Sequence, residues 1–137
     1  MNFENPTVPT NSSTTKGSVL IVEDSPDVLD IMVLTLSKAG LAVFYAESRD
    51  KAMEYLLGNN EPDVILMDVG MSGLTLGEFV SRTRTLHPDI PIVLVSAAKD
   101  LPRVAQEHSI HDYIKKPFYP EVLESLVVKC VTRRKHL

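Results

Sequence analysis

Three acidic residues and one lysine follow apolar segments of this sequence, where they could share one chemical task. Glu23 and Asp24 directly follow one short apolar run, and Asp68 follows a second. Lys116 stands just before a proline and a phenylalanine, after a third and shorter apolar stretch. If these segments are neighbouring parallel strands, the four side chains meet at one edge of one sheet.

Carboxylates that gather at one sheet edge repel one another. Two like charges about 4 Å apart cost roughly 4 kcal/mol at an effective dielectric constant of about 20. Such a cluster usually holds a hard divalent cation, and Mg²⁺ binds oxygen ligands of this kind. Glu23, Asp24 and Asp68 are therefore candidate Mg²⁺ ligands. Each acid also has a simpler explanation, because acids favour helix N-termini and aspartate is common in turns.

The composition indicates one ordinary globular domain. The chain has 137 residues, of which 44% are hydrophobic and 23% are charged. Its formal net charge of -4 does not favour nucleic acid as a partner. The basic cluster at 133–136 is interpreted as a solvated helix end, because cations favour that end of a helix.

Neither a targeting signal nor a membrane span is visible in the sequence. The N-terminus lacks the apolar core of a signal peptide, and no segment is long and apolar enough to cross a bilayer. We therefore expect a cytoplasmic protein without membrane contact. Residues 1–17 are rich in Asn, Thr, Ser and Pro and are expected to form a disordered tail. A folded domain is predicted at 18–131, followed by a basic C-terminal end at 132–137.

Apolar runs and helical periodicities alternate along the folded part. Continuous apolar runs indicate strands covered on both faces, and apolar residues at helical spacing indicate amphipathic helices. Strands are predicted at about 19–22, 41–46, 63–67, 91–95 and 112–115, and helices at about 26–39, 50–57, 78–86, 99–107 and 120–131.

This alternation predicts an α/β fold with a parallel sheet between two layers of helices. The expected architecture is a doubly wound (βα)5 fold of the flavodoxin type, with strand order 2-1-3-4-5. In such sheets a ligand binds where the strand order reverses, outside the carboxyl ends of the first and third strands. That rule places Glu23, Asp24 and Asp68 at the predicted ligand site.

Four short motifs at predicted strand ends resemble the receiver domain of bacterial two-component response regulators. They read Val-Glu-Asp-Ser-Pro at 22–26, Leu-Met-Asp-Val-Gly-Met at 66–71, Val-Ser-Ala at 95–97 and Lys-Lys-Pro-Phe at 115–118. Any one motif alone would be a weak signal. All four appear in the expected order, and the resemblance covers residues 18–131.

The resemblance implies a role for each acidic residue. Asp68 would be the phosphoacceptor, and a carboxylate can form an aspartyl-phosphate by attacking phosphorus. Asp24 would bind Mg²⁺ directly and Glu23 through water. The backbone carbonyl of Gly70 would supply a further oxygen ligand.

The resemblance also implies the groups that respond to phosphate. Lys116 would pair with the phosphoryl group, and Ser96 would hydrogen-bond one of its oxygens. Tyr113 would swing inward together with Ser96 on phosphorylation. The Lys116–Pro117 peptide bond would be cis. Taken alone, Ser96 is a turn hydroxyl, Lys116 a solvated lysine and Tyr113 a half-buried strand aromatic.

The function that the resemblance implies is phosphoacceptor signalling rather than enzymatic turnover. A histidine kinase or histidine phosphotransfer protein would donate the phosphoryl group. The signal would leave by protein–protein contact through the fourth helix, the fifth strand and the fifth helix. We expect no output domain on this chain, and the sequence leaves the oligomeric state open.

Two alternatives remain, because the chain departs from the family pattern. Ser72 stands where the family usually has proline, and Leu76 stands where it usually has glycine. An altered loop keeps open a receiver-like interaction module that works without phosphate. The enzymatic alternative is an Asp-nucleophile phosphatase. Such enzymes need a second aspartate two residues past the nucleophile as a general acid, where this chain has Gly70.

Overall fold

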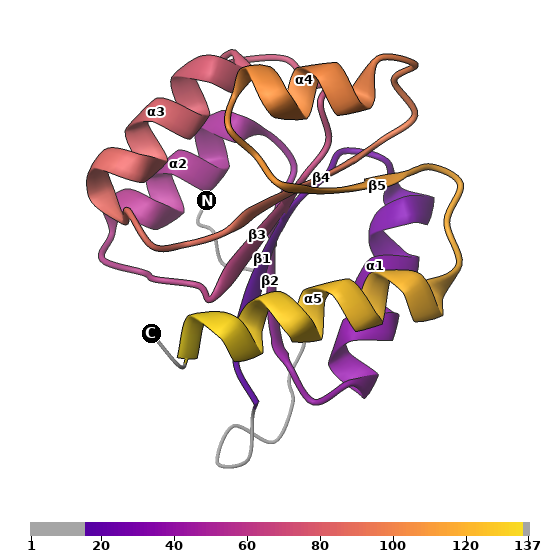
Figure 1. Ribbon diagram of the computed structural model, residues 1–137. Coiled ribbons are helices and arrows are strands. Elements are labelled where there is room, and N and C mark those ends of the chain that lie inside the picture. The colour runs from indigo at the N-terminus through magenta and orange to yellow at the C-terminus, as the bar shows by residue number, and fades with distance from the viewer. Residues whose placement is uncertain (1–15, 136–137) are drawn as a thin grey trace.

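Five strands and five helices alternate along residues 16–135 (Figure 1). The computed structural model describes residues 16–135, so residues 1–15 of the tail predicted at 1–17 lie outside the described residues. The strands are β1 (Ser18–Val22), β2 (Ala42–Ala46), β3 (Val64–Met67), β4 (Ile92–Ser96) and β5 (Asp112–Lys115). The helices are α1 (Pro26–Lys38), α2 (Arg49–Leu57), α3 (Leu76–Leu86), α4 (Leu101–Glu107) and α5 (Pro120–Lys135).

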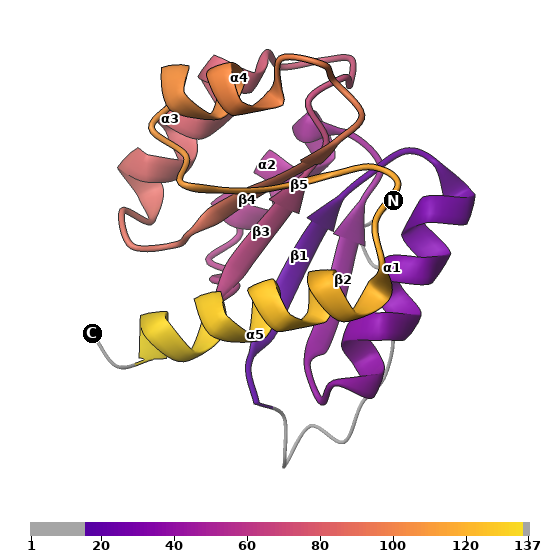
Figure 2. The same cartoon turned by 45° about the vertical axis from the view of Figure 1, so that its right-hand side comes forward.

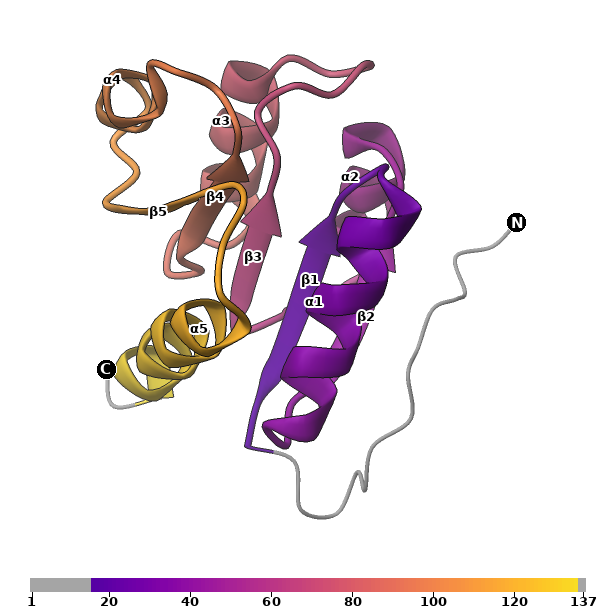
Figure 3. The same cartoon turned by 90° about the vertical axis from the view of Figure 1, so that its right-hand side faces the viewer.

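The sheet is parallel throughout and has the order β2-β1-β3-β4-β5. Helices α1 and α5 cover one face, while α2, α3 and α4 cover the other (Figures 1 and 2). In Figure 3, α1 lies in front of β1 and β2, with α2 behind them. The predicted doubly wound (βα)5 fold and its strand order are confirmed.

Alternate residues of the central strands enter two separate cores. On β1, Leu20 and Val22 pack under α2 and α3, whereas Val19 and Ile21 pack under α1 and α5. All four side chains are fully buried. Burying such a side chain contributes about 1.5–3 kcal/mol, so the two-sided burial fixes the position of the strand ends. The continuous apolar runs of the sequence are the direct mark of this arrangement.

The strand register brings the polar strand ends to one edge. Val22 pairs with Met67, so Glu23 and Asp68 each stand one residue beyond paired positions of adjacent strands. At the other side of the site Lys116 follows β5, and its backbone N–H donates to the carbonyl of Ser96 at 2.9 Å. The loops after β1, β3, β4 and β5 therefore meet at the carboxyl edge.

The boundaries differ from the predictions mainly at the two ends of the domain. The predicted tail includes Lys16 and Gly17, but the N–H of Lys16 donates to the carbonyl of Gly40, and the carbonyl of Gly17 accepts from the N–H of Ala42. The last helix was expected to end near residue 131 and runs instead to Lys135.

The basic end of α5 is part of the fold because one of its arginines is anchored. Arg134 donates to Asp63 at 2.8 Å, also pairs with Glu61, and its side chain is only 15% exposed. Asp63 in turn accepts from the backbone N–H of Ser18 at 2.9 Å. The expectation of a solvated basic end is therefore wrong for Arg134 and holds for the exposed Arg133. His136 and Leu137 lie outside the described residues.

Candidate functional site

Lys116 links the two buried ends of the acidic cluster. Its Nζ lies 2.9 Å from Glu23 Oε1 and 2.9 Å from Asp68 Oδ2. The side chains of Lys116 and Asp68 are each 16% exposed, and that of Glu23 is 2% exposed. A cation held between two carboxylates relieves the repulsion that they would otherwise feel.

The electrostatics of this triad keep Asp68 and Lys116 charged. Burial by itself raises the pKa of Asp68, but hydrogen bonds from Lys116, Gly70 and Ser96 and the charge of Lys116 outweigh it, so the pKa lies below its usual value. Burial lowers the pKa of Lys116, and its contacts with Asp68 and Glu23 raise it above the usual value. At neutral pH Asp68 is therefore an anion with nucleophilic oxygens, and Lys116 is a cation.

Glu23 and its neighbour Asp24 have opposite surroundings. Both Glu23 oxygens are engaged, one by Lys116 and the other by the backbone N–H of Ser25 at 3.1 Å. Ser25 occupies the N-cap position of α1, but its hydroxyl makes no capping hydrogen bond. Asp24 is exposed to solvent beside this buried pair. Of the two acids, Asp24 is thus the one whose carboxylate is open to a ligand.

Two further groups contact the Asp68 carboxylate. The backbone N–H of Gly70 donates to Asp68 Oδ1 at 3.2 Å. Ser96 is buried at the end of β4, and its hydroxyl lowers the pKa of Asp68 by hydrogen bonding while also accepting from Ala98 N–H at 3.2 Å. The structure thus brings Glu23, Asp68, Ser96 and Lys116 together at the carboxyl edge.

Comparison with known proteins places this arrangement in one family. Residues 19–128 match the family model of the response regulator receiver domain. The chain belongs to this family. The Lys116–Pro117 peptide bond is cis, as the resemblance implied for this receiver domain.

The curated relatives of this receiver domain are longer proteins. It is 33% identical over 129 residues to the transcriptional regulatory protein PrrA of Mycobacterium tuberculosis, and 27% identical over 119 residues to the DNA-binding transcriptional regulator NtrC of Escherichia coli. These alignments cover 91% and 85% of this chain. The chain spans about half of PrrA (54%) and a quarter of NtrC (25%).

Solved structures of isolated receiver domains match nearly end to end. A response regulator receiver domain protein from Clostridium thermocellum has a TM-score of 0.76 at 20% identity, covering 87% of this chain and 97% of that one. A CheY-like receiver domain protein from Methanospirillum hungatei has a TM-score of 0.78 at 19% identity, covering 88% and 97%. At such identities the likeness establishes the fold.

Tyr113 differs from the other predicted residues of this receiver domain. It lies on β5 opposite Leu94, whereas Lys115, two residues on, pairs with Ser96. Its side chain is 42% exposed. Tyr113 and Ser96 therefore stand on adjacent strands, one open to solvent and the other buried.

One buried charge near Asp68 was missed by sequence reasoning. Arg49, the first residue of α2, is only 2% exposed, and its guanidinium donates to backbone carbonyls of the loop that follows β3. An arginine in a helix is ordinarily read as a solvated residue. The one available signal was its place in the first turn of the helix, where a cation is disfavoured by the helix dipole.

Proposed function

We propose that this receiver domain takes a phosphoryl group from a histidine kinase or histidine phosphotransfer protein onto Asp68, with Mg²⁺, and signals by protein–protein contact. The observation that carries the proposal is the placement of Lys116 Nζ at 2.9 Å from the carboxylate of Asp68. A cation at this distance supports both the anionic nucleophile and a phosphoryl group attached to it. The low pKa of Asp68 supports the same role, because the ionised form is the nucleophile.

The transfer balances in bonds and charge. An Asp68 oxygen attacks phosphorus and forms the O–P bond, while the N–P bond of the donor phosphohistidine breaks. The imidazole leaves with the electron pair as a neutral ring, because the proton on its other nitrogen stays with it. Phosphoryl transfer needs mainly positioning and charge neutralisation from the protein. Lys116 neutralises charge on one side, and the buried Ser96 hydroxyl is placed to donate to a phosphoryl oxygen.

The residues at this edge fit Mg²⁺ by their donor chemistry. Among residues 16–135, no group of three or more His, Cys, Asp or Glu side chains is arranged so that it could hold a metal ion. Mg²⁺ does not require such a group, because it is usually bound by one or two carboxylates and keeps several waters. Asp24, Asp68 and the Gly70 carbonyl would hold it, with Glu23 acting through water. Bound there, Mg²⁺ would neutralise charge on the phosphoryl oxygens.

Replacing Asp24 by asparagine is expected to weaken Mg²⁺ binding about tenfold or more and to slow phosphorylation accordingly. In this proposal the exposed Asp24 is a direct ligand, and its charge attracts the hard cation. Mg²⁺ titration followed by amide chemical shifts measures the affinity. Asp30→Asn, at an exposed position of α1, is the control. An unchanged affinity in Asp24→Asn would remove this residue from the metal site.

Incubation with acetyl phosphate and Mg²⁺ tests the proposed function directly. We expect a hydroxylamine-sensitive phosphoryl adduct in the intact mass spectrum, and its loss when EDTA removes the metal. Absence of the adduct under saturating donor and Mg²⁺ would reject the proposal. The module that works without phosphate would then account for the fold.

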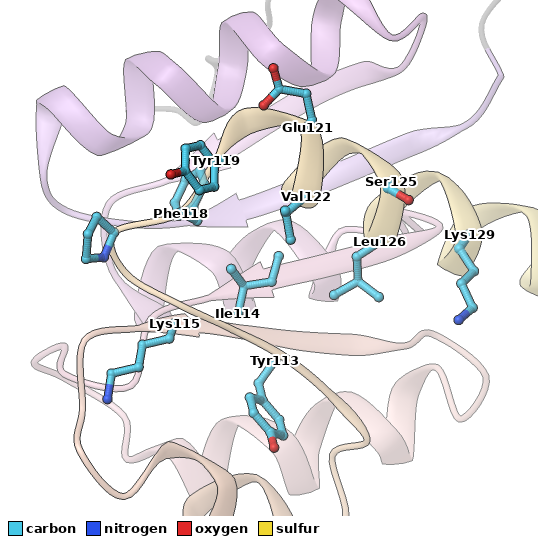
Figure 4. Close-up of a pocket in the computed structure, with 11 residues that line it drawn as sticks. Tyr113, Ile114, Lys115, Phe118, Tyr119, Glu121, Val122, Ser125, Leu126 and Lys129 are labelled. Carbon is cyan, nitrogen blue, oxygen red and sulfur yellow. The ribbon is translucent and has the colours of Figure 1, made fainter.

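The proposed signalling surface is the predicted face formed by α4, β5 and α5. Within this face, a groove of about 670 Å³ runs between β5 and α5 (Figure 4). Tyr113, Tyr119 and Val122 line it and are 42%, 77% and 51% exposed. Its charged lining residues are two lysines, Lys115 and Lys129, and one acid, Glu121, so they carry a net positive charge. We propose that a downstream protein target with an apolar, acid-flanked segment binds here.

The proposed switch connects the phosphoryl group to this surface. Phosphorylation adds about 1.5 to 2 negative charges and new acceptor oxygens beside Ser96. When the Ser96 hydroxyl turns toward them, it vacates space beside β4 that the exposed Tyr113 ring can enter. The phosphoryl group shifts this equilibrium through its different interaction with the two positions of Ser96.

Replacing Ser96 by alanine is expected to leave Asp68 able to accept a phosphoryl group while uncoupling Asp68 from the signalling surface. With beryllofluoride and Mg²⁺ as the phosphoryl mimic, amide shifts over residues 104–113 should be large in the parent and several-fold smaller in Ser96→Ala. Ser81→Ala, at an exposed position of α3, is the matched control and should respond like the parent. Equal shifts in Ser96→Ala and the parent would show that the signal travels by another route.

We also propose that this domain works in the cytoplasm. None of the helices within residues 16–135 is long and apolar enough to cross a membrane. The proposed phosphodonors and the protein target would then meet the domain in the same compartment.

A further inference from the structure

The Arg49 side chain forms hydrogen bonds with the loop that carries the proposed phosphoacceptor. This acceptor loop, residues 68–75, connects β3 to α3. Nη2 of Arg49 donates to the carbonyls of Asp68, at 3.0 Å, and Val69. Nη1 donates to those of Met71, at 3.1 Å, and Leu74, at 3.0 Å. One guanidinium thus binds four of the loop's eight carbonyl groups.

The carbonyl of Gly70 stands between the bound carbonyls and is not among them. Arg49 binds the carbonyls of Asp68 and Val69 before it and that of Met71 after it. Among residues 16–135, no hydrogen-bond donor is found for the Gly70 carbonyl. Gly70 is also open to solvent, and nothing lies within 4 Å of the place its Cβ would take. The hydrogen bonds from Arg49 therefore leave the Gly70 carbonyl available to a ligand.

The acceptor loop lacks two residues that usually restrict the backbone of this loop in the family. Where the family usually has proline and glycine, this chain has Ser72 and Leu76. The turn is made instead by Gly73, whose φ of +88° is unfavourable for other residues. A Cβ at Gly73 would lie 2.3 Å from Asp50 Oδ2, so the loop also rests closely on the first turn of α2. Contacts from Arg49 and Asp50 of α2 therefore hold the acceptor loop in place of a proline and a glycine within the loop itself.

The buried positive charge of Arg49 lies near a site where negative charge is concentrated. Arg49 is almost fully buried and forms no ion pair with any of residues 16–135, and moving an unpaired charge out of water is costly. Burial lowers the pKa of Arg49, while the negative charge of Asp68 acts in the opposite direction. The four carbonyl dipoles and Asp68 therefore offset the cost of burial, and the charge on Asp68 grows on phosphorylation.

We propose that Arg49 is a positioning residue of the acceptor loop, whose guanidinium fixes the carbonyls on either side of Gly70 and so aims the free Gly70 carbonyl at the metal bound beside Asp68. The metal part of this inference rests on the proposed function, whereas the fixing of the loop does not. The first turn of α2 thereby controls metal affinity from outside the set of ligands.

Two substitutions separate hydrogen bonding from charge. Arg49→Met keeps much of the side-chain volume but removes both donors and charge, while Arg49→Lys keeps the charge on one ammonium that cannot span four carbonyls. We expect both variants to weaken Mg²⁺ affinity, measured by amide shifts, about tenfold to a hundredfold, as loss of a residue supporting metal ligands typically does. We also expect amide hydrogen exchange of Gly70, Met71 and Gly73 to accelerate in both.

Arg84→Met supplies a matched control. Arg84 donates to the carbonyls of His108 and Ser109 at 2.7 and 2.8 Å, so its guanidinium binds the carbonyls of a different loop, between α4 and β5. Its loss should leave Mg²⁺ affinity and exchange in the acceptor loop unchanged. Parent-like exchange and parent-like Mg²⁺ affinity in Arg49→Met would overturn the proposal. Full recovery of both in Arg49→Lys would overturn it too, because charge alone would then suffice.

These readouts do not depend on phosphorylation. If the parent protein formed no phosphoryl adduct, the proposed function would fail, yet exchange and Mg²⁺ affinity would still decide the role of Arg49. If Arg49→Met failed to fold, Arg49→Lys would decide by the same two measurements. A loop that exchanges faster in Arg49→Lys while Mg²⁺ affinity stays at the parent value would reject the link to the metal.

Discussion

Replacing Asp68 by asparagine is expected to abolish phosphoryl transfer to this domain while leaving it folded. The amide matches the carboxylate in shape, and it can still accept a hydrogen bond from Lys116 or from the N–H of Gly70. It lacks the anionic oxygen that attacks phosphorus. Intact mass spectrometry after incubation with acetyl phosphate and Mg²⁺ should show the adduct in the parent and none in Asp68→Asn.

A second aspartate variant makes this experiment specific. Asp89→Asn, at an exposed position of the α3–β4 connection, should incorporate phosphate like the parent. Urea unfolding of Asp68→Asn should show a cooperative transition that confirms an intact fold. A hydroxylamine-sensitive adduct that persists in Asp68→Asn would place the acceptor on another residue.

Replacing Lys116 by methionine is expected to give a large loss of stability. The substitution keeps the length of the side chain and removes the cation that lies 2.9 Å from both Glu23 and Asp68. The buried Glu23 carboxylate would then face Asp68 without a counter-charge. Removing one partner of a buried ion pair is strongly destabilising, and we expect about 3 kcal/mol less free energy of unfolding. Urea unfolding at neutral pH measures this difference.

The pH dependence of that difference identifies its origin. The pKa of Asp68 is lowered by folding, so its contribution is present above its unfolded pKa and is lost as the pH falls through the folded value. The pKa of Lys116 is raised by folding, so its contribution is present below its unfolded pKa and is lost as the pH rises through the folded value. The difference between parent and Lys116→Met should therefore be flat from about pH 6 to 9 and shrink outside that range.

Two further variants test the assignment to the ion pairs. Lys129→Met, at an exposed position of α5, should change the free energy of unfolding by no more than about 0.5 kcal/mol. Adding Glu23→Gln to Lys116→Met should recover part of the loss, because the buried charge left without a partner is then removed. A cost in Lys116→Met as small as that of Lys129→Met would show that the triad contributes little to stability.

The fold was predictable because the three central strands are apolar on both faces. The runs ending at Val22 and Met67 leave no polar face for an antiparallel sheet, and the helical periodicities between them fill the crossovers. Helix ends were less predictable. Helix α3 begins at Leu76 rather than 78 because Thr75 and Glu78 form a reciprocal capping box at its start. Helix α5 continues to Lys135 because Arg134 finds Asp63 across the fold.

The candidate site was predictable as far as the strand ends determine it. Glu23, Asp68, Ser96 and Lys116 follow or end strands, so the order of the sheet alone brings them to one edge. Arg49 was not predictable, because its role depends on the path of a loop whose sequence departs from the family pattern. The sequence pattern around Arg49 does not show that four carbonyls of the acceptor loop lie around its guanidinium.

The last helix has a consequence for the order in which a newly made chain can fold. On the face of the sheet that packs against α1, the side chains of Val93, Val95 and Ile114 share one core with Leu123, Val127 and Val131 of α5. The opposite face needs only elements that end at Glu107, together with Ile110. During synthesis one face can therefore close early, while the other stays apolar and open until α5 has left the ribosome. Partly made chains would present that open face to chaperones or to one another.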